Sequence, residues 1–212
     1  MRPHPPFKST VTTEAELRGL LGEPSEVVKR KQLPALDQHC RAFIALSPFI
    51  LLATVDARGR CDVSPRGDAP GFVLALDDGR LAIPERPGNR RLDSLRNILQ
   101  TGSVGLLFMI PGVEEMLRVN GRACVSRDSE LLGRLAAHEK RPLLCIGVEV
   151  AECFLHCAKS VRRSRLWEHA ALTPRSALPS LARMLKDQVD LPGTTVEELG
   201  RNIEESYAER LY

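Results

Sequence analysis

The sequence has few aromatic residues, little net charge and no long apolar run. Aromatic side chains make up 4% of the 212 residues, and the formal net charge is +3. These values argue against a nucleic-acid-binding protein, because such proteins use a strong basic field and aromatic stacking platforms. The longest apolar runs, such as residues 104–110, are far too short for a helical membrane span.

Several signatures of catalysis by protein side chains are also missing. The chain has no Gly-x-Ser-x-Gly elbow, no phosphate loop ending in Gly-Lys-Ser/Thr, no His-Glu-x-x-His and no Gly-x-Gly-x-x-Gly. The sequence therefore predicts no side-chain nucleophile and leaves the catalytic residues unassigned. This absence is consistent with a protein whose bound cofactor carries the chemistry, and equally with a protein that is not an enzyme.

Residues 1–6 lack the apolar segment of a secretory signal, so we expect a cytoplasmic protein whose cysteines are reduced and buried. Cys153, His156 and Cys157 have the close spacing of zinc ligands, but a fourth ligand is missing, and we predict no metal. The six cysteines are Cys40, Cys61, Cys124, Cys145, Cys153 and Cys157.

Turn residues and apolar periodicity predict many strands joined by short turns. Six strands with one or two inserted helices favour an antiparallel barrel over a doubly wound parallel sheet. We therefore predict a mainly β (α+β) fold, a six-stranded antiparallel barrel with flanking N- and C-terminal helices. Strand-like segments lie at residues 49–56, up to 68, 71–76, 81–83, 104–110, 116–126 and 143–154. Helices are expected near residues 13–22, from 25, 37–47, 89–102, 128–138, 178–189 and 194–207.

With 43% hydrophobic residues, the chain can bury a sizeable core. Its composition changes after Phe154, where a basic segment up to Trp167 gives way to helical segments. We expect residues 1–47 to form an N-terminal helical segment, 48–167 the barrel, and 168–212 a C-terminal helical cap.

Two polar segments are candidates for a binding site. Asn89 is expected to cap a helix, and Arg90 and Arg91 beside that helix start could bind a phosphate. The alternative is a capped surface helix with two solvated arginines. The strand ending in Ser64–Asp68, sequence SPRGD, presents its backbone and one guanidinium. The alternative there is a tight turn in which Arg66 and Asp68 pair in solvent.

These segments give the chain a family resemblance. Residues 49–167 resemble the pyridoxamine 5'-phosphate oxidase-related, FMN-binding split-barrel family, and most closely an uncharacterised oxidase-like subgroup. The resemblance implies a split barrel, and a homodimer that binds two FMN molecules in clefts between its subunits. The motifs that carry it are ATVDARG at 53–59, the SPRGD segment, GNRRL at 88–92, RVNGRA at 118–123 and the basic segment before Trp167.

The resemblance also implies which residues hold the cofactor. One group would line the isoalloxazine ring, a second would bind the phosphate, and a third would reach the flavin across the dimer. The alternative for the third group is a basic helix start whose tryptophan packs into the core. The three groups are Ser64, Pro65, Arg66 and Gly67; Asn89, Arg90 and Arg91; and Lys159, Ser160, Arg163 and Trp167.

The implied activity is an FMN-dependent oxidoreductase acting on a small molecule, with a nicotinamide as candidate electron donor and with neither nucleic acid nor membrane as partner. We do not assign pyridoxamine phosphate as substrate. The oxidase has a basic residue, aliphatic residues and a lysine where this chain has residues 64–67, and its C-terminal substrate-binding sequence is not recognisable here. Two alternatives stay open: a non-catalytic flavin carrier or redox sensor, and the same barrel binding haem or a deazaflavin.

Overall fold

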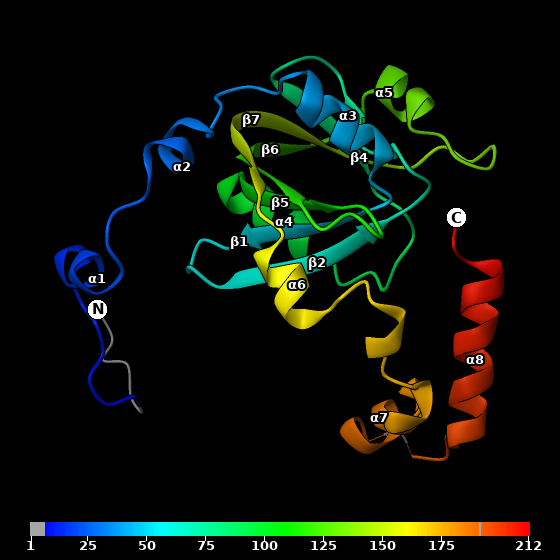
Figure 1. The fold of residues 1–212 in the computed structure, drawn as a ribbon. Coiled ribbons are helices and arrows are strands. Elements are labelled where there is room, and N and C mark those ends of the chain that lie inside the picture. The colour runs from blue at the N-terminus through cyan, green and yellow to red at the C-terminus, as the bar shows by residue number, and fades with distance from the viewer. Residues whose placement is uncertain (1–6, 191) are drawn as a thin grey trace. The chain divides into compact units, whose positions relative to one another are not determined.

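The computed structural model describes residues 7–190 and 192–212 (Figure 1). Residues 1–6, on which the expected localisation partly rests, lie outside this range. The chain forms two compact units, Met1–Gln32 and Leu33–Tyr212. Within the described ranges, no helix is both long enough and apolar enough to cross a membrane.

The first unit contains two short helices, α1 (Glu14–Leu21) and α2 (Glu26–Arg30). The Thr13 hydroxyl accepts a hydrogen bond from the Glu16 backbone N–H at 3.2 Å, which confirms the helix start that the Thr-x-x-Glu spacing predicts. Gly22 ends α1 with a φ of 76°, a conformation that glycine adopts without a steric penalty. Neither helix buries a residue.

The second unit is built on one antiparallel sheet with the strand order β2-β1-β5-β6-β7-β4-β3. The expected class, mainly β with flanking helices, is confirmed. The sheet has seven strands, whereas a six-stranded barrel was predicted, and the expected segment 71–76 contributes only the two-residue strand β3, which pairs with β4 at the sheet edge. The strands are β1 (Phe49–Val55), β2 (Cys61–Gly67), β3 (Leu74–Ala75), β4 (Arg80–Pro84), β5 (Ser103–Met109), β6 (Met116–Ser126) and β7 (Cys145–His156).

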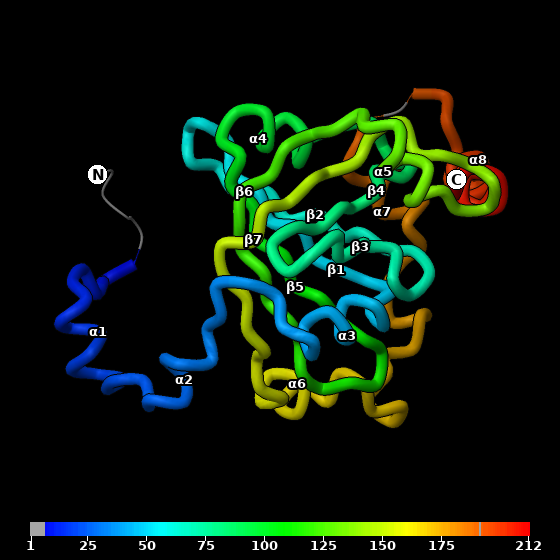
Figure 2. Tube along the Cα trace, turned by 90° about the horizontal axis from the view of Figure 1, so that it is seen from above, coloured from blue at the N-terminus to red at the C-terminus, as the bar shows by residue number. Residues whose placement is uncertain are grey.

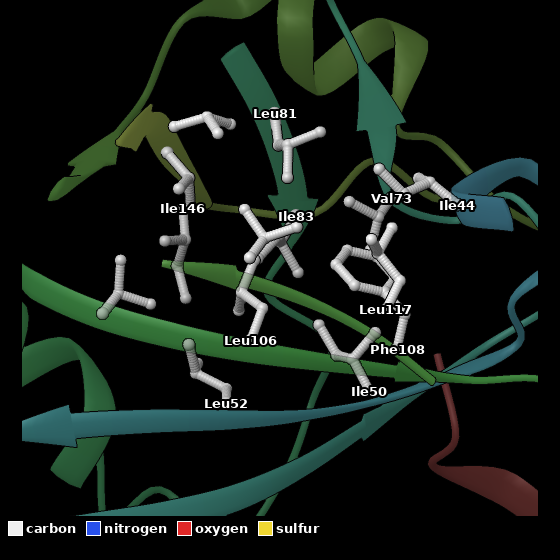
Figure 3. Close-up of a cluster of buried hydrophobic side chains, with 14 of the residues drawn as sticks. Ile44, Ile50, Leu52, Val73, Leu81, Ile83, Leu106, Phe108, Leu117 and Ile146 are labelled. Atoms are coloured by element: carbon white, nitrogen blue, oxygen red, sulfur yellow. The ribbon is translucent and has the colours of Figure 1, made fainter. Parts of the chain in front are cut away.

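The core lies inside the curved sheet, where alternate residues of β1 and β5 are buried and β4 buries four residues in a row. Helix α3 (Gln38–Leu46) adds Cys40 and Ile44 to the same core, and its start is fixed by the Asp37 carboxylate, which accepts from the Cys40 N–H at 2.7 Å. Figure 3 shows Ile44 of α3 beside core side chains from the strands. The labelled strand residues are Ile50, Leu52, Leu81, Ile83, Leu106, Phe108, Leu117 and Ile146.

The β6–β7 pairing contains a bulge between Asn120 and Gly121. A Cβ at Gly121 would overlap the carbonyl oxygen of Glu149 on the neighbouring strand. Glycine is therefore required for the two strands to approach at this bend, which curves the sheet.

Helix α4 (Asp93–Thr101) packs against β1 and β2. The Asn97 amide donates to the Thr54 hydroxyl at 3.0 Å, and the Thr101 hydroxyl donates to the Val55 carbonyl at 2.8 Å. Gly102 ends the helix in the left-handed region, as predicted. The bonds from Asn97 and Thr101 hold α4 on β1, and a bond from Ser94 Oγ to Asp62 holds the start of the helix beside the edge strand β2.

The remaining helices surround the barrel. Helix α5 (Ser129–Arg134) is shorter than the predicted segment, and α6 (Lys159–Ser164) follows directly after β7. Figure 2 shows α4 and α6 on opposite sides of the strands. The tail contains two 3₁₀ turns, His169–Ala171 and Arg175–Ala177, and two helices that pack on each other, α7 (Leu181–Gln188) and α8 (Val196–Glu209).

All six cysteines are free thiols, and three are buried as predicted: Cys40, Cys145 and Cys153. The prediction of burial is wrong for Cys61, Cys124 and Cys157, because the first two lie at outward-facing strand positions and the third lies just beyond β7. Cys40 Sγ and Cys153 Sγ are 3.9 Å apart, and burial raises the pKa of the Cys40 thiol to about 12.

Candidate functional site

The first wall of the candidate site is the end of β2. Exposure alternates along this strand, so that Ser64 and Arg66 are half-buried while Pro65 and Gly67 are exposed. Because β2 is an edge strand, the missing N–H of Pro65 breaks no ladder between two neighbours. The side chains of Ser64 and Arg66 therefore share the inward face of β2. Pro65 and Gly67 occupy the outward-facing positions.

Arg66 is held by the residue that follows β4. Its Nη1 donates to both carboxylate oxygens of Glu85, at 3.0 and 2.9 Å, and each side chain is only 19% exposed. Arg66 Nε is different, because it is buried and has no hydrogen-bond partner among the described residues. A buried donor without a partner is a rare feature of folded proteins.

Asp68 does not pair with Arg66 in solvent, so that alternative is wrong. Its side chain is 3% exposed, and Arg86 Nε donates to Oδ2 at 2.6 Å. Burial raises the pKa of Asp68, but hydrogen bonds from Tyr212, the Ala69 N–H and Arg86 outweigh burial and lower this pKa below its ordinary value. Asp68 is therefore a fixed anion beside the cofactor candidate Gly67.

The second wall is the turn before α4, and here the predicted cap is wrong. The Asn89 side chain accepts from the Arg91 N–H at 3.0 Å, which closes a local turn, and Arg90 has a φ of 59°. Helix α4 begins later, at Asp93, with Leu92 at the N-cap in the left-handed conformation. Asn89 therefore shapes the approach to the helix and does not cap it.

This start leaves α4 without a side-chain cap. The first N–H groups of the helix are consequently free of a side-chain acceptor, and they carry the positive end of the helix dipole. Arg91 Nε donates to Asp93 at 2.8 Å, and exposed Arg90 has no hydrogen bond or ion pair with any described residue. The turn thus offers amides and cationic side chains to an anion.

The structure brings these two walls together. Three side-chain contacts join β2 to residues 85–94: the Arg66–Glu85 pair, the Asp68–Arg86 pair, and a hydrogen bond of 2.9 Å from Ser94 Oγ to Asp62. Residues 85–94 therefore run beside β2, and the first two predicted groups of site residues lie on the same part of the molecule.

The third predicted group lies elsewhere in the chain. Lys159, Ser160 and Arg163 are exposed on α6, which is on the opposite side of the strands from α4 (Figure 2). Trp167 is half-buried, and its Nε1 donates to the Val113 carbonyl at 2.8 Å. A role for this group across a dimer stays a prediction.

Three residues of the site were missed by reasoning from the sequence. Glu85 and Arg86 directly follow β4, and their charge at a strand end was the available signal. The Tyr212 hydroxyl donates to Asp68 at 2.7 Å although the two residues lie 144 positions apart in the sequence. No local sequence pattern predicts such a contact.

A metal site finds no support in the described part of the chain, where no three metal-ligating side chains gather. Cys153 is fully buried whereas Cys157 is exposed, so the spacing that suggested zinc does not place the two thiols in one environment.

The comparisons with known proteins were made against families, curated proteins and solved structures. Residues 36–157, more than half of the chain, match the family described as pyridoxamine 5'-phosphate oxidase. The matched range includes both walls of the site but ends before Lys159 and Trp167. No curated protein matches the sequence.

Several solved structures are similar. HupZ from Group A Streptococcus is 18% identical, with 57% of this chain and 93% of that chain covered and a TM-score of 0.48. A putative pyridoxamine 5'-phosphate oxidase from Lactobacillus delbrueckii is 23% identical, with coverages of 58% and 98% and a TM-score of 0.46. The heme storage protein HutZ from Vibrio cholerae is 20% identical, with coverages of 57% and 93% and a TM-score of 0.40. Such distant likeness does not extend to ligands.

Proposed function

Because this chain belongs to the pyridoxamine 5'-phosphate oxidase family, we propose that it binds FMN along β2 and residues 85–94 and acts as an oxidoreductase on a small organic molecule. The observation that carries the proposal is the uncapped start of α4 with exposed Arg90 beside it, close to the Arg66 guanidinium that Glu85 holds on β2.

The phosphate end is the turn before α4. The free N–H groups of the first helical turn and the guanidinium groups of Arg90 and Arg91 suit a phosphate dianion. Three charge-assisted hydrogen bonds of about 1.5–3 kcal/mol each would supply much of the roughly 8 kcal/mol that micromolar binding requires. Asn89 contributes by holding the turn through its bond to the Arg91 amide.

The ring end is β2. The isoalloxazine edge carries carbonyl oxygens and ring nitrogens that accept hydrogen bonds, and the partly exposed guanidinium of Arg66 is a candidate donor to them. Glu85 holds the guanidinium of Arg66 in place, so the donor is oriented before a ligand arrives. Ser64 shares the face of Arg66, and Pro65 and Gly67 leave backbone open to the ring. FMN, when bound, supplies the hydride or electron transfer.

We further propose that the protein is a homodimer and that Lys159, Ser160, Arg163 and Trp167 reach the flavin of the other subunit. Within one subunit α6 lies on the opposite side of the strands from α4 and the turn before it, which favours contact with the flavin across an interface (Figure 2). Residues 48–167 would form the cofactor-binding barrel and 168–212 its helical cap. A nicotinamide donor and a cytoplasmic location belong to the same proposal.

The test is the visible spectrum of purified, untagged protein after FMN addition and desalting, with mass identification of the cofactor released on denaturation. We expect one FMN per chain. Parallel samples receive haem or a deazaflavin, and tight retention of either with none of FMN would overturn the cofactor assignment. A retained FMN that no nicotinamide or substrate reduces would leave a flavin carrier or sensor in place of an enzyme.

A further inference from the structure

The C-terminal tail contacts the candidate site at the end of β2 through Tyr212. The Tyr212 hydroxyl donates to Asp68 Oδ1 at 2.7 Å, and its ring centroid lies 4.3 Å from that of His138. Lys140 Nζ donates to the Tyr212 carbonyl oxygen at 2.9 Å, and the guanidinium of Arg86 lies 5.7 Å from the ring centroid. The tyrosine is therefore held at its hydroxyl, its ring and its backbone.

The residues that Tyr212 contacts are those that hold the SPRGD segment to residues 85–94. Asp68 accepts from Tyr212 and Ala69 N–H at one oxygen and from Arg86 at the other. Arg86 adjoins Glu85, the partner of Arg66. A continuous set of contacts thus leads from the tail, through the Asp68–Arg86 pair, to the donor assigned to the flavin ring.

From this set of contacts we propose that Tyr212 is a positioning residue for the FMN site, so that docking of the tail and binding of FMN favour each other. The proposal rests on the function proposed above. Asp68 is almost completely buried with the tyrosine in place, so removing only the hydroxyl, while the ring stays, leaves Oδ1 with the Ala69 N–H as its donor. Losing that donor weakens the hold of Asp68 on Arg86 and lets the end of β2 move relative to residues 85–94.

The variant that tests the proposal is Tyr212→Phe, which keeps the ring contacts and removes only the hydroxyl. The chain contains one other tyrosine, Tyr207 on α8, which is 54% exposed and serves as the matched control. We expect Y212F to raise the Kd for FMN roughly tenfold, within the usual range of coupling between two sites, and Y207F to leave it unchanged. In a D68N background the Y212F substitution should have little further effect, because the acceptor has already been altered.

Coupling is reciprocal, so FMN must also favour the docked tail. N-acetylimidazole modifies accessible phenols, and mass spectrometry reports the acetylation of Tyr212 and Tyr207 separately in one wild-type sample. We expect FMN to slow acetylation of Tyr212 and to leave that of Tyr207 unchanged. A merely structural contact would not give this selective protection.

The outcomes separate the two proposals. If the wild type binds FMN and Y212F binds it equally well, the coupling is wrong and the proposed cofactor stands. If the wild type does not bind FMN, the proposed function and the coupling both fail. Weaker binding by Y212F together with selective protection of Tyr212 supports both.

Discussion

The two walls of the site hold their arginines in opposite ways. At the end of β2, Arg66 and Arg86 are each paired with a carboxylate, and their side chains are 19% and 17% exposed. In the turn before α4, exposed Arg90 has no ion pair with any described residue, and Arg91 pairs with Asp93 while staying 72% exposed. The first wall is organised before a ligand arrives, whereas the second retains charge that a ligand can neutralise.

This difference assigns different tasks to the two walls. A guanidinium that is already paired and buried gains little further Coulombic energy when a ligand binds. Because it is held in one orientation, it fixes the direction of its remaining donors. An unpaired guanidinium beside a helix N-terminus gains most of its interaction energy when an anion binds. We therefore expect the turn before α4 to supply affinity and the end of β2 to supply orientation and stability.

The largest expected effect is on affinity. Arg90→Ala with Arg91→Ala should raise the Kd for FMN about a thousandfold, because two charge-assisted contacts worth roughly 4 kcal/mol together are lost. The unfolding free energy should change little. Flavin fluorescence titration measures the effect, and the double variant R127A/R201A, which removes two other exposed arginines, is the matched control. An unchanged Kd would remove the phosphate assignment from this turn.

The next effect is on stability and concerns the paired wall. Arg66→Ala leaves the Glu85 carboxylate partly buried without its partner and should lower the unfolding free energy by roughly 3 kcal/mol. The double variant R66A/E85A should be more stable than R66A alone, because it removes the unpaired charge. Urea denaturation followed by circular dichroism gives both values. Equal stability of the single and double variants would show that the pair is not coupled.

Acid should loosen the paired wall selectively. The pKa of Asp68 lies below its ordinary value because its hydrogen bonds outweigh burial. A lowered pKa means that Asp68 stabilises the fold fully above its unfolded-state pKa of about 3.9, and that this contribution is lost as pH falls through the folded-state value. The stability difference between wild type and D68N should therefore be constant near neutral pH and shrink below about pH 4. A difference that grows in acid would contradict the pairing.

The smallest effect concerns backbone strain in the open turn. Leu92 has a φ of 61° at the N-cap of α4, a conformation that costs a residue with a Cβ about 1 kcal/mol. Leu92→Gly should therefore not destabilise the protein despite the loss of a side chain that is 51% exposed. Leu99→Gly, within α4 at a 75% exposed position with ordinary helical geometry, should cost up to about 1 kcal/mol and is the control.

The sequence was sufficient for features that depend on neighbours in the chain. The helix caps at Thr13 and Asp37 and the edge strand ending in SPRGD follow from residue preferences over a few positions. The cap at Asn89 was wrong for a local reason too, because an asparagine can close a turn two residues on as readily as it caps a helix.

The contacts that organise the site could not be predicted in this way. Glu85 reaches Arg66 because β4 ends beside the edge strand β2, and this proximity depends on the curvature of the whole sheet. Tyr212 reaches Asp68 only after the entire chain has folded. Pairings between distant segments leave no periodic signal, and for that reason the buried state of Arg66 was not predicted either.

The central claim is that the turn before α4 binds the phosphate of FMN, and the most direct test compares FMN with riboflavin, which lacks only that phosphate. Titration of the wild-type protein with each flavin should give a Kd for FMN about a thousandfold below that for riboflavin, corresponding to roughly 4 kcal/mol. In R90A/R91A the two affinities should become similar. Equal affinities in the wild type would contradict the account, because the phosphate would then contribute nothing.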